Sequence, residues 1–405
     1  MCLDTITQLL NIPGFRVVKL IKITDDEIHL RVEEKERTNF NEYHSCDVVP
    51  IEGLRLGQRR VYLHVLKRKY HNPLTRKIET QKVSWIADKG RVTRALAEQI
   101  YRLTSITTNV EAGWFLGMDD QKVYRIDKGM LEMLAEERLK PTPASKNISV
   151  DEVAWKKHHR YLTNVVDVDE KVITWNKKGR KSEVLDVYYD SFTKKQLERI
   201  ESVALDGART YISSTKNKAP EAMIIWDHFH MVQKTNKTLD QVRRDELRVA
   251  RRQKDIELIE MTNCKQRFML FKARKHLTPR QEGLLEQLCQ ANEPIYKGVL
   301  LKESLVSVYA LESEDQAIEH LYSWIDSALG SGLRPFIELA WSVVEKIEYL
   351  LNWFSCRKSS AISEGFNNKI KRLKRMAYGY KDINYFCLKI HQHCGYLNPR
   401  RFSLN

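Results

Sequence analysis

The residues best suited to carry out chemistry lie in one stretch near the carboxyl terminus, residues 363–375. Its apolar residues recur at helical spacing and predict a helix with one buried side: Phe366, Ile370, Leu373 and, beyond the stretch, Ala377. A second side carries Glu364, Asn368, Lys371 and Arg375. A solvated helix face usually mixes acids and bases, whereas the whole stretch 363–375 has a single carboxylate and five bases. The carboxylate could hold a metal ion while the bases neutralise phosphates. The alternative is a basic surface helix whose Glu is an ordinary helix-start residue.

Three further acids each follow a short apolar run that predicts a strand. The runs are 148–151, 202–206 and 222–227, and they end on Asp151, Asp206 and Asp227. Apolar runs of this kind are buried on both faces of a mostly parallel sheet. The carboxyl ends of such strands are where open α/β sheets place their sites. A single Asp at a strand end is usually a turn or cap residue, but three in succession, followed by Glu364, favour a shared site.

The elements that must position these acids form a recognisable order. Residues 146–230 predict a meander of three strands, a helix over 182–200, a strand, a short helix and a strand. This is the order of a ribonuclease-H-like sheet with helices packed on both faces. Residues 231–355 then predict almost continuous helix, which reads as a helical insertion into that domain, and residues 356–405 complete it. Apolar and aromatic residues of the insertion, Trp324 and Trp341 among them, are expected in its helical core.

The amino-terminal part has a different pattern. Alternating stretches over 15–85 predict a small β module within residues 1–90. From Arg91 to residue 145 the pattern is helical, and helices over 108–116 and 119–139 flank Gly117-Met118. This arrangement is typical of a helix-turn-helix, although an ordinary helical hairpin would look the same. A proline-rich segment, 141–145, predicts a linker.

Composition narrows the class of partner. The chain has 405 residues and a formal net charge of +15, which favours a polyanion and nucleic acid above all. No apolar window is long enough to span a membrane, and the first 15 residues lack the basic start of a signal peptide. The seven scattered cysteines form no Cys-x-x-Cys pair. We therefore expect reduced thiols, a cytoplasmic location and no zinc site.

Four segments together resemble the ISL-three group of bacterial DDE transposases. They are residues 149–152 with 158–161, residues 203–206, residues 226–230, and residues 363–371 continuing through 375–380. Their order and spacing match the family from about residue 10 to the end. The resemblance implies a ribonuclease-H-like catalytic core and a helix-turn-helix at 91–139. It also implies an amino-terminal zinc module, whose cysteines this chain lacks.

The resemblance also implies roles for the acids. Asp151, Asp206 and Glu364 correspond to the metal-binding triad, and Asp227 and His230 to an accessory Asp-x-Phe-His motif beside it. The implied cofactor is a pair of Mg²⁺ or Mn²⁺ ions, because hard cations prefer carboxylate oxygens. Asp151 would bridge the ions, with Asp206 and Glu364 each holding one. Glu152 competes for the role of Asp151, since neighbouring strand residues point to opposite faces.

The implied reaction is cleavage and transfer of DNA strands at the ends of an insertion sequence. The expected partners are double-stranded DNA, as terminal inverted repeats and as target, and a second copy of the chain in a homodimer. Contacts to DNA are predicted for Asn367, Asn368, Lys369, Lys371, Arg372, Lys374 and Arg375, and less strongly for Arg243 and Arg244. Two alternatives stay open: another nuclease or resolvase with a ribonuclease-H-like fold, and a DNA-binding regulator without catalysis.

Overall fold

The computed structural model describes residues 3–36, 43–72, 75–139, 144–156, 160–263, 267–356 and 361–401. The chain forms two compact units. The first comprises residues 1–140 together with 373–405, and the second comprises residues 141–372. The linker predicted at 141–145 lies mostly outside the described residues, and the predicted domain boundaries within each unit stay predictions.

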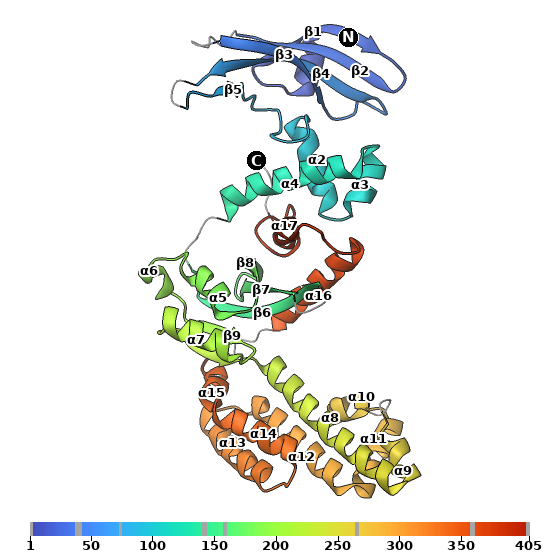
Figure 1. Ribbon diagram of the computed structural model, residues 1–405, viewed down its shortest axis with the longest axis vertical. Coiled ribbons are helices and arrows are strands. Elements are labelled where there is room, and N and C mark those ends of the chain that lie inside the picture. Colours follow the sequence, from blue (N-terminus) through green and yellow to red (C-terminus); the bar gives the residue numbers. More distant parts are fainter. Residues whose placement is uncertain are drawn as a thin grey trace. The chain divides into compact units, whose positions relative to one another are not determined.

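The first unit begins with a five-stranded sheet (Figure 1). Its strands are β1 (Phe15–Ile23), β2 (Glu27–Glu34), β3 (Tyr43–Glu52), β4 (Arg60–His71) and β5 (Ile78–Thr80), preceded by helix α1 (Leu3–Leu10). The strand order is β1-β2-β4-β3, and β5 pairs with β4. Alternate residues of β4, namely Val61, Leu63 and Val65, are fully buried, so one face of the sheet packs a core. The predicted β module is therefore present, although α1 and β3 were not foreseen.

Three helices follow this sheet: α2 (Arg94–Thr104), α3 (Asn109–Leu116) and α4 (Asp120–Arg138). Thr108 caps α3 in a reciprocal capping box with Glu111, and Asp119 caps α4. Gly117 ends α3 at a φ of 60°, a left-handed conformation that glycine adopts without strain. The two helices predicted around Gly117 are confirmed; a role in binding DNA does not follow from their presence.

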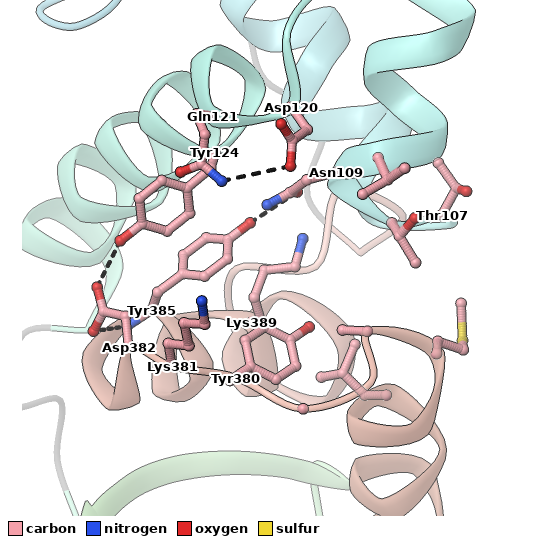
Figure 2. Close-up of a pocket in the computed structure, with 16 residues that line it drawn as sticks. Thr107, Asn109, Asp120, Gln121, Tyr124, Tyr380, Lys381, Asp382, Tyr385 and Lys389 are labelled. Carbon is pink, nitrogen blue, oxygen red and sulfur yellow. Dashed lines mark hydrogen bonds between the residues drawn. The ribbon is translucent and has the colours of Figure 1, made fainter.

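The carboxyl-terminal helix α17 (Ile383–Cys394) packs against α4, and Figure 2 shows Tyr385 of α17 beside Tyr124 of α4. Buried polar groups also join the helices of this region. The Asp127 carboxylate accepts hydrogen bonds from the Thr104 hydroxyl (2.6 Å), the Tyr385 hydroxyl (2.5 Å) and the Lys389 ammonium (3.2 Å). Lys389 also donates to the Thr104 carbonyl (2.7 Å) and to the Gln392 side chain. We call these five residues the Lys389 network.

The second unit contains a second five-stranded sheet. Its strands are β6 (Asn147–Lys156), β7 (Arg160–Asp167), β8 (Val172–Lys178), β9 (Ser202–Leu205) and β10 (Met223–Trp226), in the order β10-β9-β6-β7-β8. The meander β6–β7–β8 is antiparallel, whereas β9 is parallel to both β6 and β10. The predicted strand order along the chain is confirmed. The first strand does not end at Asp151 as expected, because pairing with β7 continues to Lys156 after pairing with β9 has stopped at Ser149.

Helices cover both faces of this sheet. On one face lie α5 (Ser182–Tyr189) and α7 (Arg209–Lys218), which pack with Ile148 and Val150 in one core. The single helix predicted over 182–200 is wrong, because Thr193 forms a capping box that starts a separate short helix, α6 (Lys194–Leu197). The other face is contacted by α16 (Ala361–Met376), which carries the residues singled out in the sequence.

The nearly continuous helix predicted over 231–355 is present, while its role as an insertion stays a prediction (Figure 1). It comprises α8 (His228–Gln253), α9 (Ile256–Met261), α10 (Arg267–Phe271), η1 (Arg274–His276), α11 (Pro279–Ala291), α12 (Glu293–Ser307), η2 (Val308–Ala310), α13 (Glu314–Leu329), α14 (Arg334–Val344) and α15 (Ile347–Cys356). Its helices share one core that includes Trp324. Trp341 was expected in this core but is 61% exposed, because it lies off the buried stripe of α14. No helix among the described residues combines the length and apolar character that crossing a bilayer requires.

Candidate active site

The three acids predicted at strand ends lie on neighbouring strands of the second sheet. The register pairs Ser149 of β6 with Ala204 of β9, and Leu205 of β9 with Trp226 of β10. Extending each parallel ladder past its last pair brings Asp151, Asp206 and Asp227 to the same level. The acids therefore meet where the parallel part of the sheet ends, which is the edge where α/β sheets bind ligands.

Asp206 is held by the turn that leaves β9. Its carboxylate accepts a hydrogen bond from the Ala208 amide at 2.8 Å. Gly207 follows with a φ of 83°, and a Cβ atom there would lie 2.9 Å from the Trp226 indole nitrogen. Only glycine fits both the backbone conformation and this close approach. The turn is thus fixed by sterics, and Asp206 stays half-buried at the end of its strand.

Asp227 and His230 belong to the first turn of α8. Asp227 caps the helix by accepting from the Phe229 amide at 3.4 Å, and it is only 2% exposed. Its second oxygen, Oδ2, is buried without a hydrogen-bond partner among the described residues. The His230 Nε2 atom lies 3.8 Å from Asp227 Oδ2 and 3.8 Å from Asp151 Oδ1. His230 therefore stands between two carboxylates.

Helix α16 reaches the same site from the other end of the sequence. The Ser363 hydroxyl donates to the Ser149 hydroxyl at 2.9 Å, and the Asn367 amide donates to Asp151 Oδ2 at 2.6 Å. Glu364 lies one helical turn before Asn367, on an adjoining side of the helix, and is exposed. The predicted apolar stripe is confirmed at Phe366, Ile370 and Leu373, which are buried, whereas Ala377 lies just beyond α16 and is only partly buried. We call Asp151, Asp206, Asp227 and His230 the acidic cluster.

The acidic cluster concentrates negative charge where water is partly excluded. Burial raises the pKa of Asp151; His230 opposes this shift, while the charges of Asp206 and Asp227 reinforce it. Burial likewise raises the pKa of Glu152. Such a group of acids is held close together at a free-energy cost that a bound cation would relieve.

Glu152, the rival of Asp151, faces the opposite side of the sheet. Its cross-strand partner is Thr163, whose hydroxyl hydrogen-bonds the Tyr211 hydroxyl of α7 at 2.8 Å. The carboxylate of Glu152 also interacts with Tyr211. Asp151 instead faces His230 and Asn367. The two adjacent acids therefore lie on opposite faces of the sheet, as the alternation of side chains along a strand requires.

The structure tests the grouping of the predicted metal ligands only in part. Among the described residues, no three His, Cys, Asp or Glu side chains are arranged to hold a metal ion. The structure brings together Asp151, Asp227 and His230, and it places Asp206 on the adjacent strand end. The convergence of Asp151, Asp206 and Glu364 on metal ions therefore stays a prediction.

The predicted DNA-contacting residues fall into two groups. On α16, Asn368, Lys369, Lys371, Arg372 and Arg375 are exposed, and Lys374 is half-buried. The other group lies on α8, where the assignment of Arg243 is corrected. Arg243 is 3% exposed, pairs with Asp240 at 2.8 Å and donates to the Thr262 carbonyl at 2.6 Å, so it is not available to DNA. Arg244 pairs with the same Asp240 from the solvent side and stays a candidate.

Sequence reasoning had assigned Asn367 to DNA and missed its contact with Asp151. The available signal was its position three residues after Glu364, because residues at this spacing project from neighbouring positions on a helix. The pairing of Ser363 with Ser149 had no signal in the sequence, since the two residues are 214 positions apart. His158 and His159, part of one matching motif, lie outside the described residues.

Comparison with known proteins places this site in a family. A family model described as transposase, DDE_Tnp_ISL3, matches residues 148–390. The chain is 29% identical over 349 residues to the transposase for insertion sequence element IS1001 of Bordetella parapertussis, an alignment that covers 86% of this chain and 84% of the relative. It is 27% identical over 272 residues to the transposase for insertion sequence element IS1557 of Mycobacterium tuberculosis, covering 61% of this chain and 59% of the relative. The matched segment contains every member of the acidic cluster as well as Glu364 and Asn367. The chain belongs to the ISL3 family of DDE transposases.

Proposed function

We propose that this transposase cleaves DNA at the ends of an insertion sequence and joins the freed 3′-hydroxyl to a target strand in a metal-dependent reaction. The observation that carries the proposal is the alignment of Asp151, Asp206 and Asp227 at one level of three adjacent strands, just past the last parallel pairs. Unrelated cap residues would have no reason to share one level of a sheet.

The architecture supports a ribonuclease-H-like core for this reaction. An antiparallel meander is extended by two parallel strands, and helices pack on both faces. A helical insertion then separates β10 from α16, the helix that carries Glu364. This is the order of elements expected for a ribonuclease-H-like core in which the last metal-binding acid, here Glu364, lies on a helix near the carboxyl terminus.

The side chains suit a hard divalent cation. The acidic cluster offers carboxylate oxygens, one of them buried and without a hydrogen-bond partner among the described residues. Burial raises the pKa of Asp151, and the charges of Asp206 and Asp227 add to this shift. We propose that Asp151, Asp206 and Glu364 hold the Mg²⁺ or Mn²⁺ ions on which this family generally depends. When bound, such ions activate the attacking oxygen and stabilise the leaving oxygen at phosphorus.

The remaining residues position the ligands and the substrate. Asn367 fixes one oxygen of Asp151 through its 2.6 Å hydrogen bond, so the other oxygen faces His230. His230 favours the ionised form of Asp151, and in its protonated form it can also attract a DNA phosphate. The exposed bases of α16 provide positive charge for the DNA backbone beyond the acids. The helices at 91–139 are proposed to bind the terminal repeats, with the chain acting as a homodimer in the cytoplasm.

The test uses the full chain, a duplex with the inverted repeats that flank its coding region, and a target plasmid, with Mg²⁺ or Mn²⁺. We expect covalent joining of the duplex end to the plasmid. Asp206→Ala should abolish joining while leaving duplex binding intact, and Asp245→Ala, which removes a half-buried acid on α8 that pairs with Arg248, serves as the matched control. Joining that persists in Asp206→Ala would refute the proposed role of that acid. Cleavage without joining would indicate a nuclease or resolvase, and binding with no cleavage would indicate a regulator.

A further inference from the structure

A groove beside α4 carries positive charge that the proposed catalytic site does not use. It is lined by Lys89, Gly90, Arg91, Lys122, Tyr124, Arg125, Lys128, Gly129 and Glu132, and its volume is about 670 Å³. The lining thus has five cations and one acid. We call it the basic groove; all of its lining belongs to the first unit.

Two of these five cations are held in ion pairs with acids of the first unit. Lys122 pairs with Glu52 at 2.6 Å, and Lys128 pairs with Asp382 at 2.7 Å. Within the described residues, Lys89, Arg91 and Arg125 form no ion pair, and all three are exposed. A surplus of like charges in one groove is unfavourable unless an anion shares it.

Two glycines allow the turn that carries Lys89 and Arg91 to lie close to α4. Gly90 has a φ of 86°, and a Cβ atom there would lie 2.3 Å from the Ile126 side chain. Gly129, in the middle of α4, faces the stem of Lys89, which a Cβ atom would approach to 2.7 Å. Glycine inside a helix costs about 1 kcal/mol relative to alanine. Both glycines let the turn at 89–91 lie closer to the helix than any other residue would allow.

We infer that the basic groove binds the sugar–phosphate backbone of double-stranded DNA. This inference rests on the proposed function, which identifies DNA as the polyanion. It adds the surface of the protein to which the DNA binds. A groove of this volume is larger than one inorganic phosphate needs and accommodates a stretch of backbone. A protein partner would require an apolar centre, whereas Tyr124 is the sole aromatic residue in the lining and its hydroxyl is bonded to Asp382.

Phosphate contacts position a protein on DNA without reading its sequence. The groove should therefore contribute equally to terminal-repeat DNA and to any other duplex. Each contact releases counterions, so the logarithm of the affinity falls with the logarithm of the salt concentration by about 0.9 per neutralised phosphate. Three unpaired cations should thus account for a slope of about three.

The experiment measures binding of the full chain to a terminal-repeat duplex and to a random duplex between about 50 mM and 500 mM salt, without divalent ions. The variant is Lys89→Gln with Arg91→Gln and Arg125→Gln. We expect its salt slope to decrease by about three and its affinity at about 0.1 M salt to fall roughly 100-fold or more on both duplexes. Arg125→Gln alone should reduce the slope by about one.

The control removes three exposed cations from β1 in the same unit, Arg16→Gln with Lys19→Gln and Lys22→Gln, and changes the net charge equally. It should bind DNA nearly as the natural chain does. An unchanged slope in the groove variant, an equal loss in the control, or a loss confined to the terminal-repeat duplex would each overturn the inference. Because no joining reaction is measured, the groove and the catalytic proposal fail independently: Asp206→Ala should bind DNA normally.

Discussion

The Lys389 network and the acidic cluster are two groups of charges built in opposite ways. In the Lys389 network the Asp127 carboxylate has a cation and two hydroxyl donors, and Lys389 has three acceptors. In the acidic cluster three carboxylates lie near a single histidine, which is close to only two of them, and the Asp227 Oδ2 atom has no hydrogen-bond partner among the described residues. The first arrangement is complete as it stands. The second is complete only with an added cation, which is the physical difference between a structural and a functional group of charges.

Breaking the complete cluster should have the largest effect on stability. Lys389→Met leaves Asp127 charged, fully buried and without its cation, so we expect the first unit to lose about 3–5 kcal/mol. Urea unfolding followed by circular dichroism measures the loss. The double variant Asp127→Asn with Lys389→Met removes both charges and should recover part of it. A single variant that unfolds like the natural chain would show that the network is not a stabilising pair.

Removing the single histidine from the acidic cluster should affect catalysis more than folding. His230 holds down the pKa of Asp151, so in His230→Gln that pKa rises further. Asp151 must be ionised to bind a cation, and activity should then fall at a higher pH than in the natural chain as the solution is acidified. We expect strand joining to slow by about 10- to 100-fold. The pH–rate profile is the measurement, and an unshifted acidic limb would contradict the proposed interaction.

Asp227→Asn should stabilise the fold, whereas Lys389→Met should destabilise it. It removes one of the crowded charges, and asparagine caps a helix as well as aspartate does. Without divalent ions we expect the variant to be more stable by about 1 kcal/mol, because a buried charge that repels the neighbouring carboxylates is lost. Thermal unfolding in a chelator tests this. A clear destabilisation would mean that the acidic cluster is already balanced, and the contrast with the Lys389 network would disappear.

The smallest effect on stability is expected at Asp382, which is partly exposed and pairs with Lys128 of α4. Burial opposes the shift, but hydrogen bonds from Lys128 and Tyr124 lower the pKa of Asp382 to about 2. A lowered pKa stabilises the fold above the ordinary value of 3.8, and this contribution is lost as the pH falls towards 2. Asp382→Asn should cost about 0.2–1 kcal/mol at pH 7. The difference in melting temperature should shrink below about pH 4; a difference that is constant with pH would contradict the assignment.

Sequence reasoning located the acidic cluster better than the Lys389 network, and the reason is physical. Asp206 and Asp227 follow short apolar runs, and burial on both faces leaves a visible pattern. Lys389 and Asp127 sit in ordinary amphipathic helices 262 positions apart, where nothing in the local pattern marks a buried pair. The prediction that Arg243 contacts DNA was wrong for the same reason, because the sequence of a basic helix does not distinguish a buried arginine from an exposed one.

The direct test of the central claim, that Asp206 is a metal ligand, is joining activity of Asp206→Cys with Mg²⁺ and with Mn²⁺. A thiolate is a soft ligand that serves Mg²⁺ poorly and Mn²⁺ better. We expect the variant to bind DNA normally, to be inactive with Mg²⁺ and to regain measurable joining with Mn²⁺. Full activity with Mg²⁺, or equal inactivity with both ions in a chain that still binds DNA, would contradict the claim.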